Sequence, residues 1–133
     1  MDLESFRTLH PQPGDRLTEA LARCVEHCAD CAQVCLACAD ACLGEEMVAD
    51  LRQCIRLDLD CATLCAATTA IAMRQTGYDR RVIDLTLHAC AEACRLCAEE
   101  CVRHRHDHCR ICAQACRACE SACLEAQRTL VVP

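Results

Sequence analysis

The feature that most constrains the fold is a repeated spacing of cysteines by three and four residues. The longest run spans residues 24–42 and reads CVEHCADCAQVCLACADAC. Related runs are CAEACRLCAEEC at 90–101 and CAQACRACESAC at 112–123. These spacings place side chains on one face of an α-helix, so each run predicts a helix with a stripe of thiols. Because this stripe occupies the core-facing position of a bundle helix, the cysteines are predicted to fill the interior.

Few breaks interrupt the helical pattern. HPQPG precedes the first helix, Gly44 and Gly77 mark two turns, and the polar run HRHDH marks a third. The intervening ranges are rich in Ala, Leu, Glu and Arg, which favour helix. We predict an all-α fold, an up-and-down antiparallel four-helix bundle with a short N-terminal segment. The expected helices cover residues 15–43, 45–75, 79–103 and 107–129. The chain is expected to form a single domain, 1–133, with an N-terminal extension (1–14) and the bundle (15–129).

Composition narrows the class of protein. The chain of 133 residues contains 18 cysteines, which usually signals a secreted disulfide scaffold. The first residues show no apolar segment and no cleavage site of an export signal, so we expect a cytoplasmic protein with reduced thiols. A net charge of −6 with dispersed arginines argues against nucleic-acid binding, and no stretch resembles a membrane span. No catalytic motif is present, so we do not expect an enzyme.

Residues that face each other across an antiparallel helical hairpin have numbers that add to a constant, so facing cysteines can be identified from the sequence. The turn near Gly44 sets Cys24, Cys28 and Cys35 against Cys65, Cys61 and Cys54. The turn near Gly77 sets Cys65, Cys61 and Cys54 against Cys90, Cys94 and Cys101. The last turn sets Cys101, Cys94 and Cys90 against Cys109, Cys116 and Cys119. The three turns therefore predict one common set of thiol layers.

The same pairing predicts an open end without facing thiols. Cys31, Cys38 and Cys42 fall opposite Asp58, Leu51 and Met47. His104 and His108 of the last turn fall level with Leu51 and Met47. Thioether, imidazole and carboxylate groups can all bind metals. The candidate ligands beyond cysteine are therefore Met47, Asp58, His104 and His108. We expect His27, His88 and His106 at the surface.

Three roles for so many core thiols can be compared. Cysteine as a mere small hydrophobe would sacrifice about 0.8 kcal/mol for each buried CH₂ that Leu would add. A disulfide framework is disfavoured because in-line spacing gives each thiol several neighbours and no single partner. Metal binding requires buried thiolates, whose charge must be neutralised by cations. One monovalent ion per thiolate achieves this, whereas zinc with four thiolates leaves excess negative charge. The sequence therefore favours Cu(I), with a zinc-binding metallothionein-like protein or a thiol redox sensor as alternatives.

With these cysteine-lined helices and the His-rich turn before the last one, the chain resembles the bacterial cytosolic copper storage proteins, the Csp family. The resemblance implies a homotetramer of bundles that store multiple Cu(I) ions, at roughly one per cysteine. It also implies that copper enters at the Met and His end, and that a copper chaperone or chelator is a partner. The cysteines that it implies as ligands are Cys24, Cys28, Cys31, Cys35, Cys38, Cys42, Cys54, Cys61, Cys65, Cys90, Cys94, Cys97, Cys101, Cys109, Cys112, Cys116, Cys119 and Cys123.

Overall fold

The regular structure is helical throughout the part of the chain that the computed structural model describes, residues 3–12 and 18–130. The elements are α1 (Leu3–Leu9), α2 (Glu19–Leu43), the 3₁₀ helix η1 (Val48–Leu51), α3 (Arg52–Ala72), α4 (Arg80–Cys101) and α5 (Asp107–Thr129). The predicted all-α class is confirmed. The expected helix start at residue 15 lies outside the described residues.

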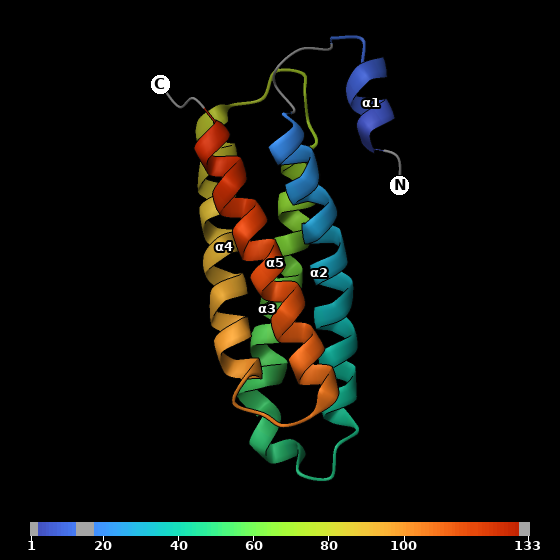
Figure 1. The fold of residues 1–133 in the computed structure, drawn as a ribbon, viewed down its shortest axis with the longest axis vertical. Coiled ribbons are helices and arrows are strands. Elements are labelled where there is room, and N and C mark those ends of the chain that lie inside the picture. The colour runs from blue at the N-terminus through green and yellow to red at the C-terminus, as the bar shows by residue number, and fades with distance from the viewer. Residues whose placement is uncertain (1–2, 13–17, 131–133) are drawn as a thin grey trace.

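The four long helices α2 to α5 run side by side along the long axis of the molecule (Figure 1). Helices α2 and α4 each pack against both α3 and α5, so the four surround one shared core. The α2–α3 and α4–α5 connections lie together at one end of the molecule. The α3–α4 connection lies at the opposite end, where α1 stands beside the long helices. Residues of both the 44–51 and 102–106 connections therefore meet at one end.

Local signals explain where the helices start. Thr18 caps α2, because its Oγ1 accepts a hydrogen bond from the Leu21 amide at 3.1 Å. Asp79 caps α4 in the same way, accepting from the Arg81 amide at 2.8 Å. Gly77 adopts a positive φ of 64°, which a residue without a side chain tolerates readily, and it turns the chain between α3 and α4.

Two features differ from the sequence prediction. The N-terminal segment contains a helix, α1, and Leu3 at its start is buried against the core. The second long helix does not begin at residue 45: the chain crosses from Gly44 to Met47, and only then do η1 and α3 follow. Glu45 lies in this crossing, and its carboxylate lies 3.2 Å from His106 and 3.6 Å from His108 of the neighbouring connection.

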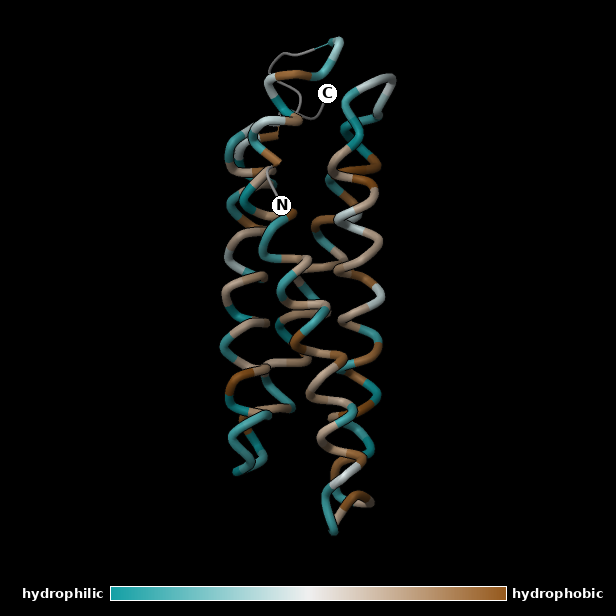
Figure 2. Tube along the Cα trace, turned by 90° about the vertical axis from the view of Figure 1, so that its right-hand side faces the viewer, coloured by the Kyte–Doolittle hydropathy of each residue, from teal (hydrophilic) through white to brown (hydrophobic). Residues whose placement is uncertain are grey.

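The core is built mainly from cysteine and alanine. Every cysteine has at most 2% of its surface exposed. Larger apolar side chains gather at the end near α1, where Leu21, Ile83 and Leu87 are buried. Hydrophobic and hydrophilic positions alternate along the helices, as expected for helices with one buried face (Figure 2). Among the described helices, none combines the length and apolar character needed to cross a membrane.

Candidate metal centre

The cysteines form one continuous column of thiols inside the four long helices. All eighteen are free and buried. Neighbouring sulfurs lie between 3.4 Å, for Cys24 and Cys123, and 4.0 Å, for Cys28 and Cys123. Each helix supplies thiols from successive turns, as Cys31 and Cys35 do at 3.8 Å. The column is therefore a dense set of soft ligands, into which one carboxyl group, that of Asp58, is inserted.

Sulfur contacts between α3 and α4 confirm the pairing predicted around Gly77. Cys65 lies 3.8 Å from Cys90, Cys61 lies 3.7 Å from Cys94, and Cys54 lies 3.7 Å from Cys101. Between α4 and α5, the predicted pair of Cys90 and Cys119 also falls within one group whose sulfurs lie within 4.8 Å of one another. Helices α3 and α4 keep the predicted register, because their connection is centred close to Gly77. The predicted α4–α5 pairs of Cys94 with Cys116 and of Cys101 with Cys109 stay predictions.

The pairing predicted around Gly44 is wrong by about one helical turn. Cys28, rather than Cys24, lies within 4.8 Å of Cys65. Cys31 lies 4.0 Å from Cys61, and Cys38 shares a four-sulfur group with Cys54. The physical reason is the longer crossing from Gly44 to Met47, which shifts α3 relative to α2. Cys42 lies in the same group as Cys38 and Cys54, so the predicted absence of facing thiols for Cys31, Cys38 and Cys42 is wrong.

A further seam joins α2 to α5, which the sequence reasoning did not consider. Four sulfur pairs lie at 3.4 to 3.8 Å: Cys24 with Cys123, Cys28 with Cys119, Cys35 with Cys112, and Cys31 with Cys116. The residue numbers of all four pairs add to the same total. This signal was present in the sequence, but the reasoning paired only consecutive helices.

The sulfur groups are dense enough to share metal ions. Sets of four sulfurs within 4.8 Å of one another include Cys28, Cys65, Cys90 and Cys119; Cys31, Cys35, Cys61 and Cys116; and Cys38, Cys42, Cys54 and Cys109. Two ligands about 2.3 Å from one ion are about 4.0 Å apart when the angle at the ion is near 120°. The observed separations therefore suit bent or trigonal coordination with only small outward shifts of the thiols.

Asp58 is a fully buried carboxyl group among these thiols. Its Oδ1 accepts hydrogen bonds from the Cys97 and Cys112 thiols at 3.1 and 3.3 Å. Its Oδ2 is buried and has no hydrogen-bond partner among the described residues. Burial, followed by the nearby Cys112 thiol, raises the pKa of Asp58 to about 8. Asp58 does not face Cys31 as predicted, because the shifted register turns it toward α4 and α5.

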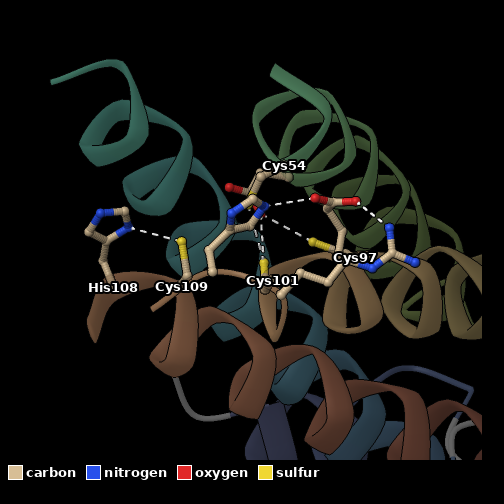
Figure 3. Close-up of polar contacts among 9 residues, drawn as sticks. Cys54, Cys97, Cys101, His108 and Cys109 are labelled. Carbon is tan, nitrogen blue, oxygen red and sulfur yellow. Dashed lines mark hydrogen bonds and ion pairs between the residues drawn. The ribbon is translucent and has the colours of Figure 1, made fainter. Parts of the chain in front are cut away.

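The end of the column near the two connections carries the imidazole of His108. Its Nδ1 lies 3.5 Å from the Cys38 sulfur. It also lies 3.6 Å from the Cys109 sulfur (Figure 3). Nitrogen and sulfur ligands at about 2.0 and 2.3 Å from one ion are about 3.5 Å apart at a tetrahedral angle. Burial raises the pKa of Cys109 to about 11, so this thiol keeps its proton at neutral pH in the metal-free protein. The geometry of a nitrogen and two sulfurs is thus already suited to one ion.

Carboxylates hold the histidines of this end. His104 Nε2 lies 2.7 Å from a Glu100 oxygen. Glu45 lies 3.2 Å from His106 Nδ1 and 3.6 Å from His108 Nε2, and the two imidazole rings stack with centroids 5.2 Å apart. His106 is therefore not a plain surface residue, as predicted, but shares a carboxylate with His108. The i,i+4 spacing of Glu100 and His104 was a visible signal, whereas Glu45 comes from a different connection and gave none.

The remaining candidates lie outside the thiol column. Met47 has 65% of its surface exposed, because it precedes η1 in the crossing and does not belong to a core-facing helix. Leu51, predicted at the same open end, is buried. His27 and His88 are exposed, which confirms their expected surface positions. The structure thus brings together the cysteines, Asp58 and His108, and leaves Met47 apart from them.

Comparison with known proteins identifies the family. The family model for copper storage protein, Csp, matches residues 17–128. The chain belongs to the copper storage protein family. The predicted resemblance is confirmed, and with it the assignment of the cysteine-rich helices to copper storage rather than to a disulfide framework.

Relatives and solved structures agree with this assignment. The cysteine-rich protein YhjQ of Bacillus subtilis, described as uncharacterized, is 38% identical over 87 residues, which are 65% of this chain and 77% of YhjQ. The copper storage protein Ccsp of Streptomyces lividans, loaded with 10 copper equivalents, is 51% identical with a TM-score of 0.93. That match covers 96% of this chain and 99% of Ccsp. Cu(I)-bound BsCsp3 is 37% identical with a TM-score of 0.71, over 80% of this chain and 96% of BsCsp3.

Proposed function

We propose that this protein stores many Cu(I) ions in its thiol column and releases them by ligand exchange. The observation that carries the proposal is a column of eighteen buried, free cysteines, in which most sulfurs lie 3.4 to 4.0 Å from a neighbouring sulfur and the others belong to groups within 4.8 Å. Soft thiolates prefer a soft monovalent ion such as Cu(I). Related proteins have been described as Cu(I)-bound and as loaded with 10 copper equivalents.

The proposed capacity is roughly one Cu(I) per cysteine, with all eighteen cysteines as ligands. Each ion that binds displaces thiol protons, so that the core exchanges protons for copper and remains close to neutral. Without this exchange, buried thiolates would repel one another and cost far more than the fold can offset. The proposal therefore includes proton release on loading.

We propose that copper enters at the end where the α2–α3 and α4–α5 connections meet. His108 is assigned as the first imidazole ligand with Cys38 and Cys109, because of the nitrogen–sulfur distances of 3.5 and 3.6 Å. His104 is assigned to the same end, and Asp58 binds or orients copper deeper in the column. Met47 is exposed beside this end and acts as an outer thioether ligand before copper reaches the thiols.

The finer assembly belongs to the same proposal. The subunit is a single-domain, up-and-down antiparallel four-helix bundle, four copies form a homotetramer, and the protein acts in the cytoplasm without catalysing a reaction. Exposed apolar residues on the long helices, such as Leu36, Leu85 and Ile111, supply surface for contacts between copies. A related Streptomyces lividans protein is described as a cytosolic copper storage protein. A copper chaperone or chelator is the expected exchange partner.

An anaerobic titration with Cu(I) in the presence of a chromophoric chelator tests the function. Storage predicts that the protein withholds copper from the chelator up to roughly eighteen equivalents per chain. A structural zinc protein would instead hold about four or five tetrahedral ions, and a redox sensor would form reversible disulfides and hold few metals. A plateau at one or two copper ions would overturn the storage proposal. A thiol count before the titration ensures that all cysteines are reduced.

A further inference from the structure

A pocket of about 410 Å³ lies against the copper entrance, between the end of α4 and the first turns of α5. Its lining residues are Val102, His104, Arg105, Arg110, Ala113, Gln114 and Arg117. Three of the seven are arginines, although the chain as a whole carries a net charge of −6. The pocket is therefore a local concentration of positive charge on an acidic protein.

Most of this positive charge is not neutralised by the residues that the structure describes. Among the described residues, Arg105 and Arg117 have no carboxylate within ion-pair distance. Arg110 pairs only with Asp107, at 3.6 Å, and both side chains are largely exposed. Exposed pairs of this kind are weak and exchange readily. Guanidinium groups offer several donors in a planar fork that matches carboxylate geometry, so the pocket is equipped to bind carboxylates.

The pocket reaches the copper site through His104. This residue lines the pocket, and its Nε2 contacts Glu100 at 2.7 Å. His104 retains 17% of its side-chain surface exposed, so a molecule in the pocket can contact it. A copper complex bound by the arginines would thus be held beside an imidazole of the entrance.

The charge of copper carriers explains why such a pocket is needed. Cu(I) in a reducing compartment is held by thiolates, and one monovalent ion with two thiolates forms an anion. Carboxylates on the carrier add further negative charge. An acidic protein repels such anions at long range, whereas a local basic cleft raises their concentration and their association rate. Free cationic copper would need no such cleft.

We propose that the arginine pocket binds anionic, carboxylate-bearing Cu(I) complexes and presents them to the His104 end of the thiol column. The proposal rests on the proposed storage function and names the form in which copper arrives. In the transfer, a copper–ligand bond of the carrier breaks and a copper–sulfur bond to a protein cysteine forms. The protein thiol loses its proton, and the released carrier ligand accepts it. Copper remains Cu(I), so no oxidant or reductant takes part.

The test compares loading rates from two copper donors of opposite charge. The anionic donor is the bis(bicinchoninate) complex of Cu(I), and the cationic donor is Cu(I) in acetonitrile. The pocket variant is Arg105→Gln with Arg117→Gln. The matched control is Arg52→Gln with Arg56→Gln, which removes the same charge from α3, a helix that packs against α2 and α4. Stopped-flow mixing under anaerobic conditions follows each donor.

The pocket variant is expected to load about tenfold more slowly than wild type from the anionic donor, because local positive potential accelerates association by at least this factor. Added salt should reduce the difference. The control should load within twofold of wild type, and neither variant should slow with the cationic donor. Equal slowing in both variants, no slowing in the pocket variant, or slowing with the cationic donor would overturn the pocket proposal. The copper capacity at the plateau tests storage itself, so the two proposals fail separately.

Discussion

The thiol column has two halves with different chemistry, and their comparison explains how a buried store can exchange metal. In the inner half, around Cys28, Cys65, Cys90 and Cys119, sulfur contacts only sulfur in the described contacts. In the outer half, sulfurs also contact the Asp58 carboxyl group and the His108 imidazole. These groups add carboxyl oxygens and imidazole nitrogens to the sulfur ligands of the outer half, whereas the inner half offers sulfur alone. The outer half is thus suited to exchange and the inner half to retention.

The largest expected effect is the difference in thermal stability between the copper-loaded and the metal-free protein. Copper that binds only the folded state stabilises it by about 2.7 kcal/mol for each independent site at a hundredfold excess over the dissociation constant. Because the inner half alone offers several sites, the melting temperature of the loaded protein should rise by tens of degrees. Anaerobic circular dichroism melts with and without copper measure the rise. A strong Cu(I) chelator should reverse it, and a rise of only a few degrees would contradict a fully used column.

The second prediction concerns Asp58 in the metal-free protein. Its pKa in the folded state is raised to about 8 from the ordinary value of 3.8, so the folded protein binds more protons between these values. Its contribution to stability is fully present below pH 4 and is lost as the pH rises through 8. Asp58→Asn removes this titration. As the pH rises from 4 to 8, the free energy of unfolding of the variant should therefore increase by a few kcal/mol relative to that of wild type.

Urea unfolding of the reduced, metal-free proteins at several pH values measures that difference. The matched control is Asp60→Asn, because Asp60 lies on the same helix with an exposed side chain. Comparing wild type with each variant at the same pH cancels the titration of the cysteines that do not contact Asp58. A difference in the free energy of unfolding between wild type and the Asp58 variant that stays constant across pH would contradict the prediction. It would show that the carboxyl group is ionised inside the protein, or is as well solvated there as in the unfolded chain.

The same two halves show what could be predicted from the sequence. Helical spacing and cysteine periodicity predicted the core, and residue pairing around Gly77 predicted the contacts of Cys61 with Cys94 and of Cys65 with Cys90. These contacts follow from regular helices joined by a turn whose centre, near Gly77, can be recognised in the sequence. The outer half depends on the Gly44–Met47 crossing, where Glu45 contacts His106 and His108 of a connection distant in sequence. Helical periodicity carries no information on such contacts, so the register of α2 against α3 and the role of Glu45 could not be predicted.

The smallest expected effect addresses that missed contact. A Glu45 oxygen lies 3.6 Å from His108 Nε2, which has no hydrogen-bond partner among the described residues, and Nδ1 lies near the Cys38 and Cys109 sulfurs. We predict that a small approach of this carboxylate during copper binding keeps the proton on Nε2 and leaves the lone pair of Nδ1 for copper. Loss of such a carboxylate partner commonly weakens metal binding or activity by 10-fold to about 100-fold. Glu45→Gln should therefore slow the first phase of copper loading by about tenfold and leave the final capacity unchanged, since the thiols remain.

Glu46→Gln is the matched control, because it removes the same charge from the neighbouring, exposed position. Stopped-flow loading of the two variants, together with the imidazole ¹⁵N shifts of His108 in the metal-free protein, distinguishes positioning from simple electrostatic attraction. Positioning predicts a changed tautomer and slower loading in the Glu45 variant only. If both variants slow equally and the ¹⁵N shifts do not change, Glu45 acts merely as one negative charge among many. The outer half would then owe its exchange to His108 and Asp58 alone.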